Sequence, residues 1–185
     1  MPLELSKRTF SIDEYHKMGD SGLFADERVE LVEGEVIAMA PKGSRHAGCV
    51  TRLNRVFTTN INDSFLVRVQ DPLRLSDRTE LEPDIAVVHS RPDFYASAHP
   101  SAKDALLVIE VAESSLTYDR DVKMLLYARA GVQEAWLVDL TWQQIIIQSS
   151  PSDEGYEVVK NHGRGTVINP PSLPQLQLTA DDVLG

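Results

Sequence analysis

The chain has 185 residues, of which 42% are hydrophobic and 25% charged, and its net charge is −10. This composition excludes a disordered chain, and the length fits one domain with a full-sized core. The negative charge argues against a protein that holds nucleic acid by non-specific charge, although it does not exclude a nuclease that uses a metal ion.

The single cysteine, Cys49, excludes an intramolecular disulfide and a metal site built from cysteines. No apolar run is long enough to span a bilayer, and the N-terminal residues lack the basic and apolar layout of a secretory signal. We therefore expect a cytoplasmic protein that does not contact a membrane.

The N-terminal part is predicted to form a helix and a hairpin. Ser11 and Glu14 have the spacing of a capping box, which predicts a short helix that begins there. Residues 29–39 are typical of two strands that meet at a tight turn around Glu33 and Gly34.

A longer helix is predicted to follow. Ser44 comes after the pattern-breaking residues Pro41 and Gly43, and we expect it to be the N-cap of a helix that runs to about Asn60. One face of this helix carries four residues at helical spacing, namely His46, Val50, Leu53 and Phe57.

The middle of the chain is predicted to be made of strands. Residues 65–69 and 73–75 are short strand candidates, and the polar segment 76–82 is expected to be a linker. A further strand is expected over 83–88, and the segment 90–104, which contains two prolines, is expected to be an irregular loop.

The second half alternates between strands and a helix. An apolar strand is predicted over 106–112, and a helix over 117–130 is expected to end at Gly131. Two more strands are predicted over 134–140 and 143–148. The remaining residues are rich in turn-forming types, so we expect a hairpin and a short terminal cap.

These elements define the expected fold class. The two apolar strands of the second half are nearly continuous, which indicates that helices cover both faces of the sheet. We expect α/β or α+β architecture with a mixed central sheet flanked by helices. The chain is interpreted as one domain over 1–185, with a core at about 44–148 and a C-terminal hairpin and cap over 149–185.

Two acidic residues, Asp84 and Glu110, lie within otherwise apolar strands. A buried carboxylate is costly unless a positive charge compensates it. Strand alternation places Asp84 on a face with Ala86, and Glu110 on a face with Ala112. If the two strands pair, both acids can point to the same side, and the small alanines leave room beside them.

The chemistry of such a pair suits a hard cation. A few anionic oxygen ligands favour Mg²⁺ or Mn²⁺, which retain waters and accept substrate phosphate as a further ligand. Such an ion polarises a phosphoryl oxygen and lowers the pKa of a bound water. Two alternatives remain: Asp84 can be a turn residue that follows Pro83, and Glu110 can be a buried acid paired with an arginine.

The ordered set of motifs resembles a known family. The chain is similar to a large bacterial family of putative restriction endonucleases of uncharacterised function, within the restriction-endonuclease-like superfamily, whose motif is PD-(D/E)XK. The resemblance covers about residues 9–140. The matching segments are 30–35, His46, 82–87, 108–111, 121–123, Tyr127, 131–132 and 134–139.

The resemblance implies a restriction-endonuclease-like core and a catalytic lysine. The superfamily pattern expects that lysine two residues after Glu110, where this chain has Ala112. The closer family points instead to Lys123, which can stabilise charge on the scissile phosphate or orient the attacking water. The alternative is that Lys123 pairs with Asp119 on a helix surface.

Four further residues are candidates for the site. By the resemblance, Glu33 can supply another acid, His46 can carry a proton, and the carbonyl of Val111 can be a metal ligand. The alternatives are a hairpin-turn role for Glu33 and a partly buried helix-start role for His46. Gln70 can face the site or be an ordinary exposed residue of a strand.

The sequence therefore predicts a Mg²⁺-dependent endonuclease that hydrolyses DNA phosphodiester bonds, with Asp84 and Glu110 as metal ligands and Lys123 as the electrostatic catalyst. One alternative is a weak or inactive nuclease-fold protein that acts as a dimeric binding module. Another is a metal-dependent hydrolase of small phosphoesters. A homodimer is expected from the resemblance and from the apolar run Ile145-Ile146-Ile147, which must be covered.

Overall fold

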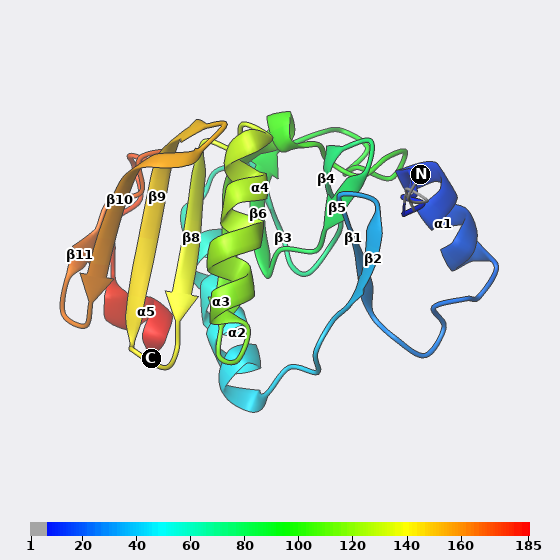
Figure 1. The fold of residues 1–185 in the computed structure, drawn as a ribbon. Helices are drawn as coiled ribbons and strands as arrows, with labels where there is room; N and C mark the ends of the chain where they lie inside the picture. Colours follow the sequence, from blue (N-terminus) through cyan, green and yellow to red (C-terminus); the bar gives the residue numbers. More distant parts are fainter. Residues whose placement is uncertain (1–6) are drawn as a thin grey trace.

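A six-stranded mixed sheet forms the centre of the molecule in the computed structural model, which describes residues 7–185 (Figure 1). The strand order is β10-β9-β8-β7-β6-β3, and β7 and β8 are parallel while all other neighbours are antiparallel. The strands are β3 (Phe65–Arg68), β6 (Ile85–His89), β7 (Ala105–Ala112), β8 (Glu134–Asp139), β9 (Gln144–Ser152) and β10 (Gly155–Gly163). The expected mixed central sheet is confirmed.

One crossover joins the two parallel strands. It consists of α3 (Leu116–Tyr118), the π-helical turn η2 (Asp119–Lys123) and α4 (Met124–Arg129). Gly131, with φ of +83°, allows the turn after the helix. The predicted helix over 117–130 is confirmed, but its π-helical turn was not predicted.

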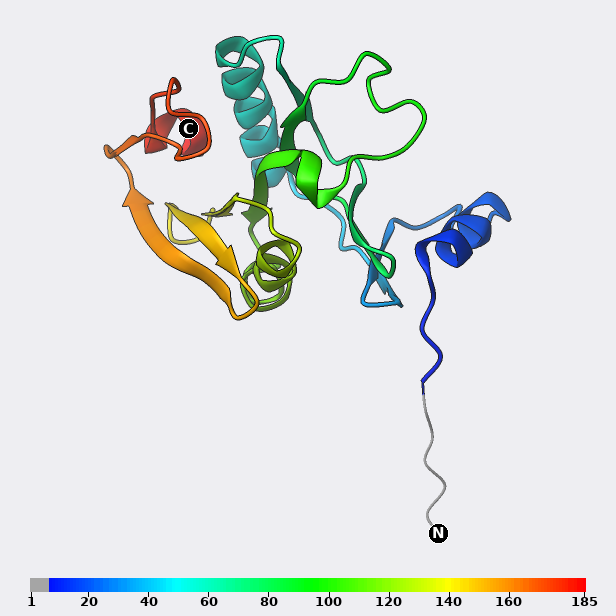
Figure 2. The ribbon, with the colours of Figure 1, turned by 90° about the horizontal axis from the view of Figure 1, so that it is seen from above.

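Helices cover both faces of the large sheet, as Figure 2 shows from above. The helices α2 (Ser44–Asn60) and α5 (Ala180–Leu184) lie on one face, and α4 lies on the other. On the first face, the side chains of Leu53 and Phe57 pack in one cluster with residues of β6, β7 and β8. This arrangement explains why the strands are apolar on both sides.

A smaller four-stranded antiparallel sheet lies beside the large one. Its order is β2-β1-β5-β4, and its strands are β1 (Val29–Val32), β2 (Glu35–Ala38), β4 (Leu73–Ser76) and β5 (Thr79–Leu81). The predicted linker over 76–82 is therefore wrong in part, because Thr79–Leu81 forms a buried strand that pairs with β1 and β4.

The N-terminal elements agree with the capping prediction. The helix α1 (Ile12–Asp20) begins after Ser11, and Ser11 and Glu14 form a complete capping box. The hairpin of β1 and β2 turns at Glu33 and Gly34, which have φ of +50° and +85°. The N-cap of α2 is Gly43 and not Ser44, which is the first residue of the helix.

The C-terminal part supplies β10, one edge strand of the large sheet, and then packs on one face of that sheet. The strand predicted over 143–148 extends to Ser152 and forms a hairpin with β10. The remaining elements are β11 (Val167–Ile168) and β12 (Leu178–Thr179), followed by α5. Ile145 and Ile147 of β9 are buried in the same cluster as this C-terminal segment. The chain itself therefore covers much of the apolar run that had suggested a dimer.

The loop before β7 contains one short 3-10 turn, η1 (Ala102–Asp104). Among residues 7–185, no helix combines the length and the apolar character needed to cross a membrane.

Candidate active site

Asp84 and Glu110 are brought together by the pairing of β6 with β7. Ile85 pairs with Ile109 in an antiparallel ladder. Continuing this register by one residue places Asp84 opposite Glu110. Residues opposite each other in such a ladder point to the same face. Both side chains are buried and both line a cavity of about 290 Å³.

Acidic side chains outnumber basic ones around this cavity. Lys42, His46 and Lys123 are the lining residues able to carry positive charge. Six carboxylates face them: Glu30, Glu82, Asp84, Glu110, Glu113 and Asp119. The cavity therefore has an excess of negative charge, which favours the binding of a cation.

The carboxylate of Asp84 accepts four hydrogen bonds. Lys42 Nζ lies 2.9 Å and Gln70 Nε2 3.0 Å from Oδ1. His46 Nε2 and the backbone nitrogen of Val111 each lie 2.9 Å from Oδ2. Burial alone would raise the pKa of Asp84, but His46 and then Lys42 lower it to about 2, so the group is ionised at neutral pH.

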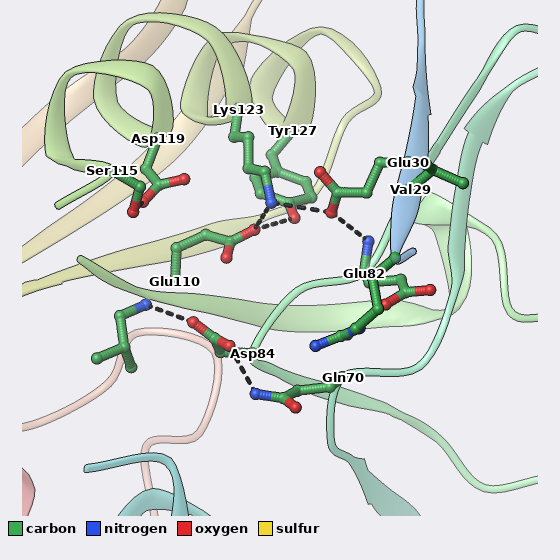
Figure 3. Close-up of polar contacts among 12 residues, drawn as sticks. Val29, Glu30, Gln70, Glu82, Asp84, Glu110, Ser115, Asp119, Lys123 and Tyr127 are labelled. Atoms are coloured by element: carbon green, nitrogen blue, oxygen red, sulfur yellow. Dashed lines mark hydrogen bonds and ion pairs between the residues drawn. The ribbon is translucent and has the colours of Figure 1, made fainter. Parts of the chain in front are cut away.

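Glu110 is held from the crossover helix (Figure 3). Tyr127 donates its hydroxyl proton to Glu110 Oε1 over 2.6 Å, and Lys123 Nζ lies 3.3 Å from the same oxygen. Lys123 Nζ also lies 2.9 Å from Oε1 of Glu30, which in turn accepts the backbone N–H of Glu82 over 2.7 Å. One ammonium group thus serves two buried carboxylates.

The shared ammonium group leaves Glu110 poorly compensated. Burial raises the pKa of Glu110, Lys123 opposes this rise, and the nearby carboxylates of Asp119, Asp84 and Glu30 add to it. Burial would lower the pKa of Lys123, but Glu110 and Glu30 raise it, so Lys123 stays charged. The pKa of Tyr127 is raised by burial and by Glu110, so its hydroxyl remains a donor.

The π-helical turn lies where Lys123 enters the site. A π turn changes the phase of a helix, and such turns are frequent at functional sites. Here Lys123 ends the turn and Tyr127 follows four residues later, so both reach the same oxygen of Glu110. Asp119, at the start of the turn, accepts a hydrogen bond from the hydroxyl of Ser115 over 2.5 Å. The ion pairs of Lys123 are formed with Glu30 and Glu110, and the alternative surface pair with Asp119 is not formed as a hydrogen bond or ion pair.

Of the remaining candidate residues, three lie at the cavity or contact Asp84, and one lies away from it. His46 is buried on the first turn of α2 beside Asp84, and Gln70, with φ of +55°, also faces Asp84. Val111 follows Glu110 and lines the cavity. Glu33 is exposed in the hairpin turn and is not among the residues that line the cavity, so the structure does not bring it together with Asp84 and Glu110.

Three contacting residues were missed by the sequence analysis. Glu30 lies in the apolar run of β1 and is 2% exposed, so the signal that identified Glu110 was present there as well. Tyr127 belonged to the family resemblance but had received no role. Lys42 lies in the segment between β2 and α2, and nothing in its local sequence indicated the contact with Asp84.

Within the part of the chain that the structure describes, no group of three or more His, Cys, Asp or Glu side chains is arranged to hold a metal ion. A closed site of the zinc type is therefore not formed by residues 7–185. Mg²⁺ differs, because it binds through one or two carboxylates and keeps several waters.

The comparison with solved structures identifies the fold class. The chain is similar to a crystal structure described as a putative nuclease belonging to DUF820 from Anabaena variabilis ATCC 29413, with a TM-score of 0.76, 17% identity, and coverage of 95% of this chain and 97% of that chain. It matches the type IIG restriction endonuclease BpuSI with a TM-score of 0.40 and 15% identity, over 64% of this chain and 14% of that chain. The fold is restriction-endonuclease-like, as the first comparison shows.

The family follows from the sequence. The family model Uma2, described as "Putative restriction endonuclease", matches residues 12–181. The chain belongs to this family, which confirms the predicted resemblance. No protein with a curated function matches the chain.

Proposed function

We propose that the protein is a divalent-metal-dependent nuclease that hydrolyses phosphodiester bonds in DNA. The observation that carries the proposal is the convergence of Asp84 and Glu110, from paired strands, on one cavity with an excess of carboxylates. The description of the family as restriction endonucleases supports the choice of reaction and of substrate.

The donor set fits Mg²⁺ or Mn²⁺. Both polar contacts of Glu110 end on Oε1, and no hydrogen bond to its Oε2 is found among residues 7–185 (Figure 3). Asp84 and Glu110 would hold the ion together with the carbonyl oxygen of Val111. Two carboxylates and one carbonyl are a suitable set for an ion that keeps waters and takes phosphate oxygens as further ligands.

The bound ion would polarise the scissile phosphate and lower the pKa of an attacking water. Lys123 positions Glu110 and contributes positive charge close to the place where the phosphate would lie. His46 orients Asp84 through Oδ2 and lines the cavity, so it is placed to receive or donate a proton.

The net charge of −10 is compatible with a DNA substrate only if local cations compensate the phosphates. Lys42 lines the cavity, and Arg45, which is exposed, follows three residues later in the sequence. Together with a bound divalent ion, these cations would offset the acidity of the cavity. We therefore expect activity to depend on the ion and to fall steeply as salt is added.

The test combines ion binding with cleavage. Binding of Mn²⁺ is measured by calorimetry, and cleavage of supercoiled and linear DNA by gel electrophoresis, for the wild type and for Asp84→Asn, Glu110→Gln and Lys123→Met. Glu157→Gln is the matched control, since it removes an exposed carboxylate on β10 that lies outside the cavity.

Asp84→Asn and Glu110→Gln are expected to lose Mn²⁺ binding and cleavage, whereas the control variant keeps both. Equal Mn²⁺ affinity in the wild type and in Asp84→Asn would remove the proposal. Metal binding without cleavage of any DNA or RNA would favour a nuclease-fold binding module.

The homodimer stays a prediction that depends on the family resemblance alone, because Ile145 and Ile147 are buried within the chain. Light scattering at micromolar concentration tests it, and a monomer would count against it.

A further inference from the structure

The carboxylate of Asp84 has no acceptor position left for a metal ion. A carboxylate offers about four lone-pair positions over its two oxygens. All four are used here, by Lys42 and Gln70 on Oδ1 and by His46 and Val111 on Oδ2. Any ion that binds Asp84 must therefore displace one of the four donors.

The four donors differ in how firmly they are held. The N–H of Val111 belongs to the backbone of β7 and cannot leave without breaking the strand. His46 is fixed on the first turn of α2 and is buried. Gln70 has a backbone φ of +55° and lies between β3 of the large sheet and β4 of the small sheet.

Lys42 is the donor that can move. It lies in a segment, residues 39–43, that is neither helix nor strand, and its side chain is 19% exposed while that of Asp84 is 5% exposed. Its ammonium group is joined to the backbone by four methylene groups, so it can swing away without moving the chain. It is also the donor with a full positive charge and a path to solvent, and it lines the same cavity.

We infer that Lys42 is a tethered cation that neutralises Asp84 in the metal-free protein and is displaced when a divalent ion binds. The inference depends on the proposed metal site at Asp84. Lys42 would thereby hold the site in its folded geometry without metal, and would also set the concentration of metal at which the nuclease becomes loaded. Because the ammonium group of Lys42 must be displaced first, it weakens the apparent affinity of the site for the divalent ion.

Calorimetry with Mn²⁺ alone tests this competition without any substrate. The variants are Lys42→Met, which removes the charge but keeps the length of the side chain, and Lys42→Arg, which keeps the charge. Lys103→Met is the matched control, because Lys103 is exposed and outside the cavity, and its loss changes the net charge by the same amount. Asp84→Asn reports whether the ion binds at the proposed site.

Lys42→Met is expected to bind Mn²⁺ roughly fivefold or more tightly than the wild type, within the range of ordinary coupling between ligands. Lys42→Arg and Lys103→Met should stay near the wild-type value. Equal or weaker binding in Lys42→Met, with normal binding in the wild type, would overturn the role of Lys42 and leave the metal site intact. If neither the wild type nor Lys42→Met binds Mn²⁺, the metal site and this inference are both overturned.

A second measurement does not need a variant. Acetylation of lysine amines by a water-soluble ester, followed by mass spectrometry, reports how free each amine is. Lys42 is expected to react faster when Mn²⁺ is added, whereas exposed Lys160 on β10 should react at an unchanged rate. An unchanged rate at Lys42 under saturating Mn²⁺ would contradict the displacement.

Discussion

Lys123 Nζ lies 2.9 Å from Glu30 Oε1, although 93 residues separate the two in sequence. Lys123 belongs to the crossover between β7 and β8 of the large sheet, and Glu30 belongs to β1 of the small sheet. Their ion pair therefore joins the two sheets at the wall of the cavity. The lysine that positions Glu110 also fixes the small sheet against the large one.

Replacing Lys123 by methionine is expected to destabilise the fold strongly. The side chain of Lys123 is 6% exposed, and those of its partners Glu30 and Glu110 are 2% and 4% exposed. Loss of one partner leaves buried carboxylates without compensation, which typically costs about 3–5 kcal/mol. Urea denaturation followed by circular dichroism at neutral pH gives the free energy of unfolding.

A double-mutant cycle separates the ion pair from general packing. Glu30→Gln removes one of the two carboxylates that share the ammonium group, so the double variant Glu30→Gln with Lys123→Met should lose less than the sum of the single losses. Strict additivity would contradict a direct coupling between Glu30 and Lys123.

The sequence allowed the paired acids to be predicted because their burial is a local signal. Asp84 and Glu110 lie in apolar runs, and strand alternation gave the face on which each lies. The capping box of Ser11 and Glu14 likewise specified the start of α1 through residues three apart. Features of this kind depend on neighbours in the sequence and can be read directly from it.

The features that were missed depend on distant partners. The strand β5 is only three residues long, and its central residue Glu80 is polar, so its burial depends on pairing with β1, which lies about fifty residues earlier. The contact of Lys42 with Asp84 spans 42 residues. The π-helical turn has no local sequence signature, and without it the directions of Lys123 and Tyr127 could not be predicted.

Gly34 is expected to be intolerant of any side chain. Its φ of +85° is strained for other residues, and a Cβ atom there would lie 2.6 Å from Thr9 Cβ. Gly34→Ala should lower the free energy of unfolding by about 1–3 kcal/mol. Gly22→Ala is the control, because Gly22 has φ of +81° but no atom within 4 Å of the added carbon. Equal losses in the two variants would show that the close approach of Thr9 contributes nothing.

The thiol of Cys49 is expected to be unreactive in the folded protein. Burial raises its pKa to about 11, the charge of Asp84 adds to this rise, and Arg52 opposes it. At pH 8 almost no thiolate is present, and the thiolate is the reactive form. A colorimetric disulfide reagent should therefore react with one thiol per chain in denaturant and with almost none before denaturation. Rapid reaction without denaturant would show that the α2 and α5 layer opens readily.

Above pH 4.5, the contribution of Glu110 to the stability of the metal-free protein is expected to fall as the pH rises. Burial and the neighbouring carboxylates raise the pKa of Glu110 in the folded state above the ordinary value of 4.5. The folded protein then binds this proton more tightly than the unfolded chain does. The contribution of Glu110 to stability is thus complete below pH 4.5 and is lost as the pH rises through the raised pKa.

Glu110→Gln provides the comparison, since an amide of similar shape does not ionise. The free energy of unfolding of both proteins is measured in urea with a chelator at several pH values above 4.5. As the pH increases, the free energy of unfolding of the wild type should fall relative to that of Glu110→Gln. Saturating Mn²⁺ should reverse this trend in the wild type alone, because an ion that binds the ionised carboxylate of the folded state stabilises that state. If the pH profiles of the two chelated proteins run parallel, the carboxyl group of Glu110 keeps an ordinary pKa in the fold, and Lys123 compensates the charge of Glu110 in spite of its burial.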